Sequence, residues 1–282
     1  MGFSIRGIVH TLGSYARKAE QAVSGKAQQA AHGAKDAFEQ TTHAAERAAV
    51  VGGSAAARAI QNHTHAPTLG TPNPRAGIGR PPVILLAGQG DDAKQAMRVF
   101  SNSLKRDGFK VIVFDDPGHA LESHAAASAK LDTLVEQVRA ASGGQKVDLV
   151  GYSTGGTNAR AYVNLYGGAS KVDRVVQLAG TNNGDPAAFG FAASGVEEKK
   201  GSAFMKDLNA HPANVPIYSI YEKGADGAVS EEDGRLVPDA LRHNVELPQA
   251  QKGGGFIAWS DHVKLPYDAR AYEQVLAALT CD

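Results

Sequence analysis

From residue 83 to the end of the chain, short apolar runs alternate with longer amphipathic stretches, and this alternation limits the possible folds. The apolar runs lack polar residues at every second position, which indicates strands buried on both faces. Strands that alternate with helices predict a parallel sheet covered on both sides. We expect strands at Val83–Ala87, Lys110–Phe114, Val147–Val150, Arg174–Leu178, Val215–Tyr221 and His243–Leu247. We expect helices at Ala93–Lys105, at His124–Ala141, from the end of the third strand to about Tyr166, and at Asp268–Leu279.

The chain divides into three zones of different composition. Residues 1–65 hold 16 alanines, seven basic residues and four acidic residues, which predicts a helical N-terminal arm with a net charge of +3. Residues 66–82 hold five prolines and are expected to form a linker. Residues 83–282 are expected to form an α/β domain with about six strands.

Composition excludes several classes of protein. Lys and Arg together number 29, as do Asp and Glu, so the chain lacks the basic surplus of a nucleic-acid-binding protein. No apolar run is long enough for a membrane span. Cys281 is the only cysteine, which excludes an internal disulfide and argues against a cysteine-based metal site.

A serine stands at the junction of an expected strand and helix. The sequence Gly151–Gly155 (GYSTG) follows the strand Val147–Val150 directly. A serine hydroxyl becomes a useful nucleophile when it is exposed beside a base, and a sharp glycine-flanked turn exposes it. The following helix offers backbone N–H groups to a developing oxyanion. Ser153 is therefore a candidate nucleophile; a glycine-rich turn with a structural serine is the alternative.

A second glycine motif, Gly88–Ala93 (GQGDDA), follows the first expected strand. With Asp115 at the end of the next strand, it matches a dinucleotide-binding pattern, which makes a nucleotide-dependent oxidoreductase a rival interpretation. Asp91 and Asp92 argue against it, because they would repel a pyrophosphate. In serine hydrolases built on such a sheet, the same loop donates an oxyanion N–H.

A serine nucleophile at such a turn requires an acid and then a histidine later in the chain. Three histidines follow Ser153, and His262 is the expected base because it precedes the last helix. His211 is expected in a loop and His243 at the start of a strand. Asp226 is the expected acid because it follows the strand Val215–Tyr221 in a glycine-flanked loop.

Other carboxylates compete with Asp226. Asp233 and Asp239 are expected to be solvated loop charges. Asp261 adjoins His262, but neighbouring side chains on an extended loop diverge.

The segment Asp148–Gly184 resembles the small bacterial α/β-hydrolase lipases of the lipase class 2 type. The likeness continues in order through Ser202–Asn209, Ile217–Val229 and Ser260–Leu265, and it spans about Pro82 to Leu279. The resemblance implies an α/β-hydrolase fold, with 83–282 as the catalytic domain. It also implies a serine esterase or lipase that acts on apolar acyl esters without metal or organic cofactor.

The resemblance assigns roles to residues of this sequence. It implies Ser153 as nucleophile, Asp226 as acid and His262 as base, with the backbone N–H groups of Gln89 and Thr154 as the oxyanion hole. The family usually has His-Gly after the first strand, whereas this chain has Ala87 and Gly88. Because the hole uses backbone donors, we expect activity to survive this difference.

Three matters stay open at the level of sequence. The same triad suits a phospholipase or an acyltransferase on membrane lipids, and an inactive hydrolase fold that serves as a binding module is a further alternative. The basic arm offers a possible peripheral membrane contact. Residues 1–20 lack the apolar centre of a cleavable signal, so export by another route and a cytoplasmic location both stay open.

One segment is a candidate cover for the cleft. Ala187–Lys200 follows the glycine- and threonine-rich turn, and Phe189 and Phe191 are candidates for lining an acyl groove. Within it, residues 197–200 are expected to be solvated. A plain surface loop is the alternative.

Overall fold

The computed structural model describes residues 68–185, 192–224, 226, 228–248 and 258–281. The predicted helical arm lies outside these residues, as do Phe189 and Phe191. The division into arm, linker and catalytic domain therefore stays a prediction.

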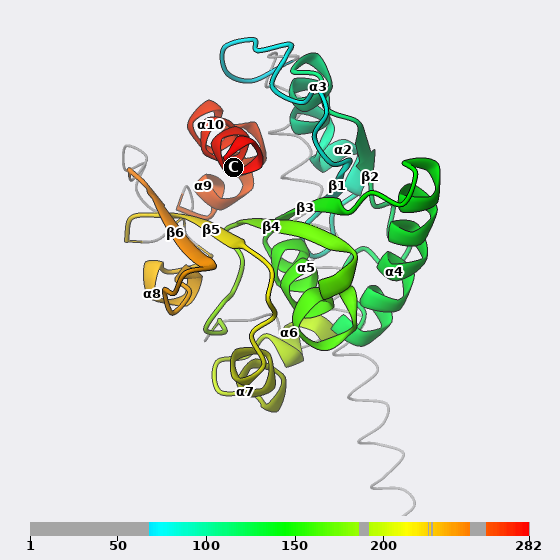
Figure 1. The fold of residues 1–282 in the computed structure, drawn as a ribbon. Helices are drawn as coiled ribbons and strands as arrows, with labels where there is room; N and C mark the ends of the chain where they lie inside the picture. The colour runs from blue at the N-terminus through cyan, green and yellow to red at the C-terminus, as the bar shows by residue number, and fades with distance from the viewer. Residues whose placement is uncertain (1–67, 186–191, 225, 227, 249–257, 282) are drawn as a thin grey trace, which may run out of the picture. The chain divides into compact units, whose positions relative to one another are not determined.

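Six parallel strands form one sheet in the order β2-β1-β3-β4-β5-β6 (Figure 1). The strands are β1 Val83–Leu86, β2 Val111–Val113, β3 Val147–Tyr152, β4 Val172–Leu178, β5 Ile217–Glu222 and β6 Arg242–Leu247. Each lies within two residues of its predicted bounds. The predicted parallel α/β sheet is confirmed.

Helices cover both faces of the sheet. The helices are α2 Ala93–Ala96, α3 Arg98–Arg106, α4 His124–Ala141, α5 Thr154–Leu165, α6 Ala193–Glu197, α7 Ala203–Ala210, α8 Glu231–Gly234, α9 Ala258–Lys264 and α10 Ala269–Thr280, with 3₁₀ turns η1 Gly168–Ser170 and η3 Leu265–Tyr267. The predicted helix over residues 93–105 is two helices, because the chain leaves helical geometry at Met97. The sequence analysis did not predict α6, α7, α8 or α9, the longest of which has eight residues.

Alternate residues of each strand belong to different cores, because successive side chains of a strand point to opposite faces. Val83 and Leu85 pack with α3 and α10, whereas Ile84 and Leu86 pack with α4 and α5. Figure 1 shows the two pairs of helices on opposite sides of the sheet. All four side chains are fully or almost fully buried. Burial on both faces explains why these strands read as continuous apolar runs in the sequence.

The described part of the proline-rich segment packs against this body. Leu69 is buried in the core that contains α10, and its N–H donates to Ser103 Oγ at 2.7 Å. Arg80 donates to the carbonyl of Thr280 at 2.8 Å.

One carboxyl is buried inside the sheet. Asp148, near the start of β3, is fully buried, and Arg174 Nε lies 3.6 Å from its Oδ1. Neither oxygen accepts a hydrogen bond from the residues that the structure describes. Burial raises the pKa of Asp148 to about 8, although the Arg174 charge opposes the shift.

This carboxyl generates a prediction about stability. Because its pKa is higher in the folded state, Asp148 takes up a proton on folding. The stability that this protonation contributes is fully present below the unfolded-state pKa and is lost as pH rises through about 8. Asp148→Asn carries no ionisable group and should be more stable than wild type at pH 8 by about 1–3 kcal/mol, well under the limit of 1.36 kcal/mol per pKa unit. Urea unfolding at pH 5 and pH 8 measures the difference, and an equal advantage at both pH values would contradict the assignment.

Candidate active site

Ser153 lies at the sharp turn between β3 and α5. Its backbone has φ +54° and ψ −130°, a conformation that costs a non-glycine residue about 1–3 kcal/mol. Its N–H donates to the carbonyl of Leu178 at the end of β4 at 2.8 Å. The strand, the helix and β4 therefore hold the serine in this strained conformation.

Two glycines make this turn possible. A Cβ on Gly151 would lie 2.3 Å from the carbonyl oxygen of Gly155, and one on Gly155 would lie 2.4 Å from that of Ala87. Both distances are far below any real contact, so the first turn of α5 packs directly on the backbone of β3 and of the loop after β1.

Asp226 is held in the loop after β5. Its Oδ1 accepts from the N–H groups of Ala228 at 2.9 Å and Val229 at 2.7 Å, which leaves Oδ2 for His262. His262 lies in α9, and its backbone N–H donates to the carbonyl of Asp226 at 2.8 Å. Tyr152 OH donates to the carbonyl of His262 at 3.1 Å, so the backbone of the histidine is fixed from both sides.

The structure brings the three predicted triad residues together. His262 Nδ1 lies 2.7 Å from Asp226 Oδ2, and His262 Nε2 lies 3.0 Å from Ser153 Oγ. An ionised carboxylate only accepts hydrogen bonds, so Nδ1 carries the proton that it donates to Asp226. The lone pair of Nε2 then faces the serine hydroxyl.

Burial and charge act in opposite directions on this pair. Burial lowers the pKa of His262, but the charge of Asp226 and its hydrogen bond outweigh burial, so the pKa is raised overall. Burial raises the pKa of Asp226, while the attraction of His262 and two backbone N–H groups lower it below its ordinary value. The pair favours an ionised carboxylate beside an imidazole of increased basicity.

The other histidines and carboxylates that the sequence analysis considered have different partners. His211 is exposed at the end of α7 and pairs with Asp207, whereas His243 lies on β6 and stacks on Tyr218 at 4.6 Å. Asp239 is exposed, as predicted. The expectation of a solvated loop residue at Asp233 is wrong. Asp233 lies in the short helix α8, is buried and pairs with Lys200 at 3.1 Å, because α8 packs on the turn after β4.

The expectation of an extended loop at Asp261 and His262 is also wrong. Both residues lie in α9, where successive side chains point about 100° apart. Asp261 pairs with Lys264 at 3.3 Å.

The predicted oxyanion residues lie on the two segments that meet at Ser153. Thr154 is the first residue of α5. Gln89 follows Gly88, whose Cβ position would be 3.2 Å from Ser153 Cβ, so the loop after β1 runs beside the nucleophile. Within the described residues, the backbone N–H groups of Gln89 and Thr154 have no hydrogen-bond acceptor. Helix N-termini and such loops are where oxyanion donors are found.

The glycine motif after β1 belongs to this site. Asp92 Oδ1 accepts from the N–H of Gln95 at the start of α2, and Asp115 pairs with Lys94 on the surface. The second and third strands lie on opposite sides of the first, whereas a dinucleotide-binding sheet places them on the same side. This strand order argues against a dinucleotide-binding sheet.

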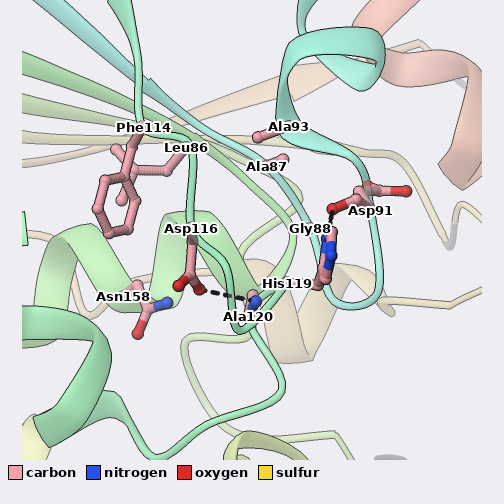
Figure 2. Close-up of a pocket in the computed structure, with 10 residues that line it drawn as sticks. All are labelled: Leu86, Ala87, Gly88, Asp91, Ala93, Phe114, Asp116, His119, Ala120 and Asn158. Atoms are coloured by element: carbon pink, nitrogen blue, oxygen red, sulfur yellow. Dashed lines mark hydrogen bonds between the residues drawn. The ribbon is translucent and has the colours of Figure 1, made fainter. Parts of the chain in front are cut away.

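A small hollow with room for about one water molecule lies beside this loop (Figure 2). Figure 2 shows the His119 ring beside Gly88 and Asp91, with Asp116 and Ala120 across from them. Among the described residues, no group of three or more His, Cys, Asp or Glu side chains is arranged to hold a metal ion. No described helix has the length and apolarity to cross a membrane.

A family model described as the alpha/beta hydrolase fold matches residues 81–213. The chain has the α/β-hydrolase fold. The match contains Gln89, Ser153 and Thr154 but ends before Asp226 and His262. A search of curated proteins returned no match.

Solved structures show the same fold. The mature form of *Bacillus licheniformis* lipase BlEst2 is 17% identical with a TM-score of 0.59, and the match covers 76% of this chain and 96% of that one. *Aspergillus fumigatus* lipase B is 17% identical with a TM-score of 0.55, over 74% of this chain and 54% of that one. The predicted resemblance to α/β-hydrolase lipases is confirmed at the level of the fold.

The sequence analysis missed a buried polar cluster behind the nucleophile turn. It predicted solvated residues over 197–200, but Glu198 is buried, whereas Lys199 and Lys200 are exposed. Glu198 lies 3.1 Å from His124 Nε2 and accepts a hydrogen bond from Thr181. No local pattern marks it, because its partners come from distant parts of the chain.

The close packing at the turn is testable. Gly155→Ala should lower the free energy of unfolding by about 1–3 kcal/mol through overpacking. It should also slow labelling of Ser153 by a fluorophosphonate, because the loop after β1 must move. Urea unfolding and labelling rates measure both effects.

Gly201→Ala is the matched control. Gly201 has a positive φ, +79°, unlike Gly155, and no atom lies within 4 Å of its Cβ position. The free energy of unfolding of Gly201→Ala should fall by only about 1 kcal/mol, because alanine is strained at a positive φ, and its labelling rate should match wild type. A Gly155→Ala protein indistinguishable from this control would contradict the packing argument.

Proposed function

We propose that this protein is a serine hydrolase that cleaves carboxylic esters through an acyl intermediate on Ser153. The observation that carries the proposal is the continuous hydrogen-bonded sequence from Asp226 Oδ2 through His262 to Ser153 Oγ. Its distances suit proton transfer from the hydroxyl to the imidazole. The strained conformation of Ser153 supports the same role, since such strain is concentrated at functional sites.

In the proposed first half-reaction, Ser153 Oγ attacks the ester carbonyl and His262 Nε2 takes its proton. The N–H groups of Gln89 and Thr154 stabilise the charge that develops on the carbonyl oxygen. His262 then donates the proton to the departing alcohol, which leaves an acyl-Ser153 ester. Asp226 holds the imidazole tautomer and stabilises its charged form throughout.

In the second half-reaction, water attacks the acyl-serine carbonyl and His262 accepts the proton of the water. Collapse of the tetrahedral intermediate releases the carboxylic acid, and the proton returns to Ser153. Every proton passes through His262, so the reaction needs no other acid or base.

Two of the structurally similar proteins are lipases, which supports esters of apolar acyl chains as the substrate class. The triad is equally suited to different leaving groups and acceptors, so chain-length preference has to be measured. A series of p-nitrophenyl esters from short to long acyl chains provides that measurement.

Ser153→Ala should reduce kcat for the best ester by about 10³-fold or more, as loss of a nucleophile does in serine hydrolases. It should also abolish fluorophosphonate labelling. Ser170→Ala, at an exposed position in η1, is the control and should match wild type. An Ser153→Ala protein that retains full esterase activity would refute the proposed function.

The pH dependence follows from His262. The base must be neutral to accept a proton, so kcat/KM should fall as pH decreases through its pKa. Because that pKa is raised, the midpoint should lie above about 6.5, the ordinary value for histidine. A midpoint below that value would contradict the assigned electrostatics.

Asp226→Asn provides the comparison for this pH profile. It removes the charge that raises the pKa, so the midpoint should move to lower pH while the maximal rate falls. The rate falls because the amide no longer selects the required tautomer.

A further inference from the structure

Helix α6 directs two polar side chains toward the nucleophile turn. Ser194 and Glu198 are four residues apart and therefore lie on the same side of the helix, and the N–H of Glu198 donates to the Ser194 carbonyl at 2.8 Å. Ser194 is 1% exposed and Glu198 4% exposed, although the neighbouring Val196 is 50% exposed. The two side chains thus face the protein interior.

Ser194 binds the segment that carries Gln89. Gln89 Nε2 donates to Ser194 Oγ at 2.9 Å, and Ser194 Oγ donates to the carbonyl of Ala120 at 2.7 Å. The hydroxyl uses its single proton on Ala120 and accepts from Gln89, so both contacts form together. Gln89 is thereby tied to α6 and to the loop after β2.

The loop after β2 is itself firmly held. His119 and Ala120 both have positive φ, 49° and 55°, and the two carboxylate oxygens of Asp116 accept from the N–H groups of Gly118 and Ala120. Figure 2 shows the second of these bonds and the contact from the His119 ring to the carbonyl of Asp91. Ser194 therefore connects Gln89 to a rigid support.

Glu198 binds the segment that carries Thr154. Its Oε2 accepts from Thr181 Oγ1 at 2.7 Å and from Thr154 Oγ1 at 3.4 Å. Thr181 has one hydroxyl proton, which goes to the carboxylate, so Thr157 donates its own to Thr181 Oγ1 at 2.9 Å. Glu198 thus orders hydroxyls at both ends of the first turn of α5.

The other carboxylate oxygen of Glu198 faces His124. The 3.1 Å approach of Oε1 to His124 Nε2 is an electrostatic contact whose angles lie outside those of a hydrogen bond. The His124 ring is fully buried, stacks on Phe204 at 4.4 Å and contacts Asn158 on α5 through Nδ1. A buried carboxylate is costly without such partners, so the cluster keeps Glu198 in one place.

We infer that Ser194 and Glu198 are positioning residues for the two halves of the oxyanion hole. Ser194 holds the loop of Gln89, Glu198 holds the first turn of α5 at Thr154, and one short helix sets the distance between the two backbone donors. This inference rests on the proposed function. Neither side chain contacts the triad, so both act through the donors rather than on the proton transfer.

The test compares Ser194→Ala and Glu198→Ala with wild type. Each should lower kcat for a p-nitrophenyl ester by about 10- to 100-fold with KM nearly unchanged, because a donor displaced by about 1 Å loses contact with the oxyanion but not with the substrate. Affinity for an alkyl boronic acid, which forms a tetrahedral adduct on Ser153, should fall in parallel. A purely structural role would not change boronic-acid affinity in folded protein.

Two variants provide the controls. Glu197→Gln removes a carboxylate whose Oε2 accepts from the backbone N–H of His124 at 2.7 Å. Among the described residues this carboxylate forms no hydrogen bond with Gln89 or Thr154, so the variant should keep wild-type kcat. Glu198→Gln keeps one accepting oxygen and should retain more activity than Glu198→Ala. If Glu198→Ala does not fold, Glu198→Gln still allows the role of Glu198 to be measured.

The outcomes separate the two proposals. Normal kcat and boronic-acid affinity in Ser194→Ala and Glu198→Ala, together with an inactive Ser153→Ala protein, would overturn the positioning role alone. Full activity in Ser153→Ala would overturn the proposed function itself.

Discussion

The packing of the first turn of α5 on the loop after β1 is the constraint on which the rest of the site depends. Gly155 approaches the carbonyl of Ala87 at a distance that leaves no room for a side chain, and Gly88 lies tightly against Ser153. β1 and β3 are neighbours in register, with Leu86 beside Gly151, so their ends arrive together. This contact places Ser153, Thr154 and Gln89 next to one another.

Two buried pairs of carboxylate and imidazole flank this turn. Asp226 contacts His262 at 2.7 Å and reaches the Ser153 hydroxyl through the ring, whereas Glu198 lies 3.1 Å from His124 and reaches Thr154 directly. Each carboxylate also accepts further hydrogen bonds, which offset the cost of removing charge from water. In a poorly hydrated site these interactions are stronger than they would be in water.

The parallel sheet explains why such distant residues meet. Ser153 follows β3, Asp226 follows β5, and Gln89 follows β1, and the carboxyl ends of parallel strands lie at one edge of the sheet. His262 comes to the same edge from α9, where the backbone bond to Asp226 and the bond from Tyr152 hold it. The opposite end of β3 carries the buried Asp148, whose ionisation affects stability.

The amino-acid sequence by itself determined the six-stranded parallel sheet, because apolar runs bounded by amphipathic stretches have few other ways to be buried. It also indicated Ser153, Asp226 and His262, since the glycine-flanked serine and the order of acid and base are local or sequential signals. Helix ends such as the break at Met97 and the short α9 escaped prediction, because a few residues carry little periodicity. Only the tertiary structure decided that Glu198 and Asp233 are buried. Their burial depends on partners from α4, the turn after β4 and Lys200, and no local pattern records such long-range contacts.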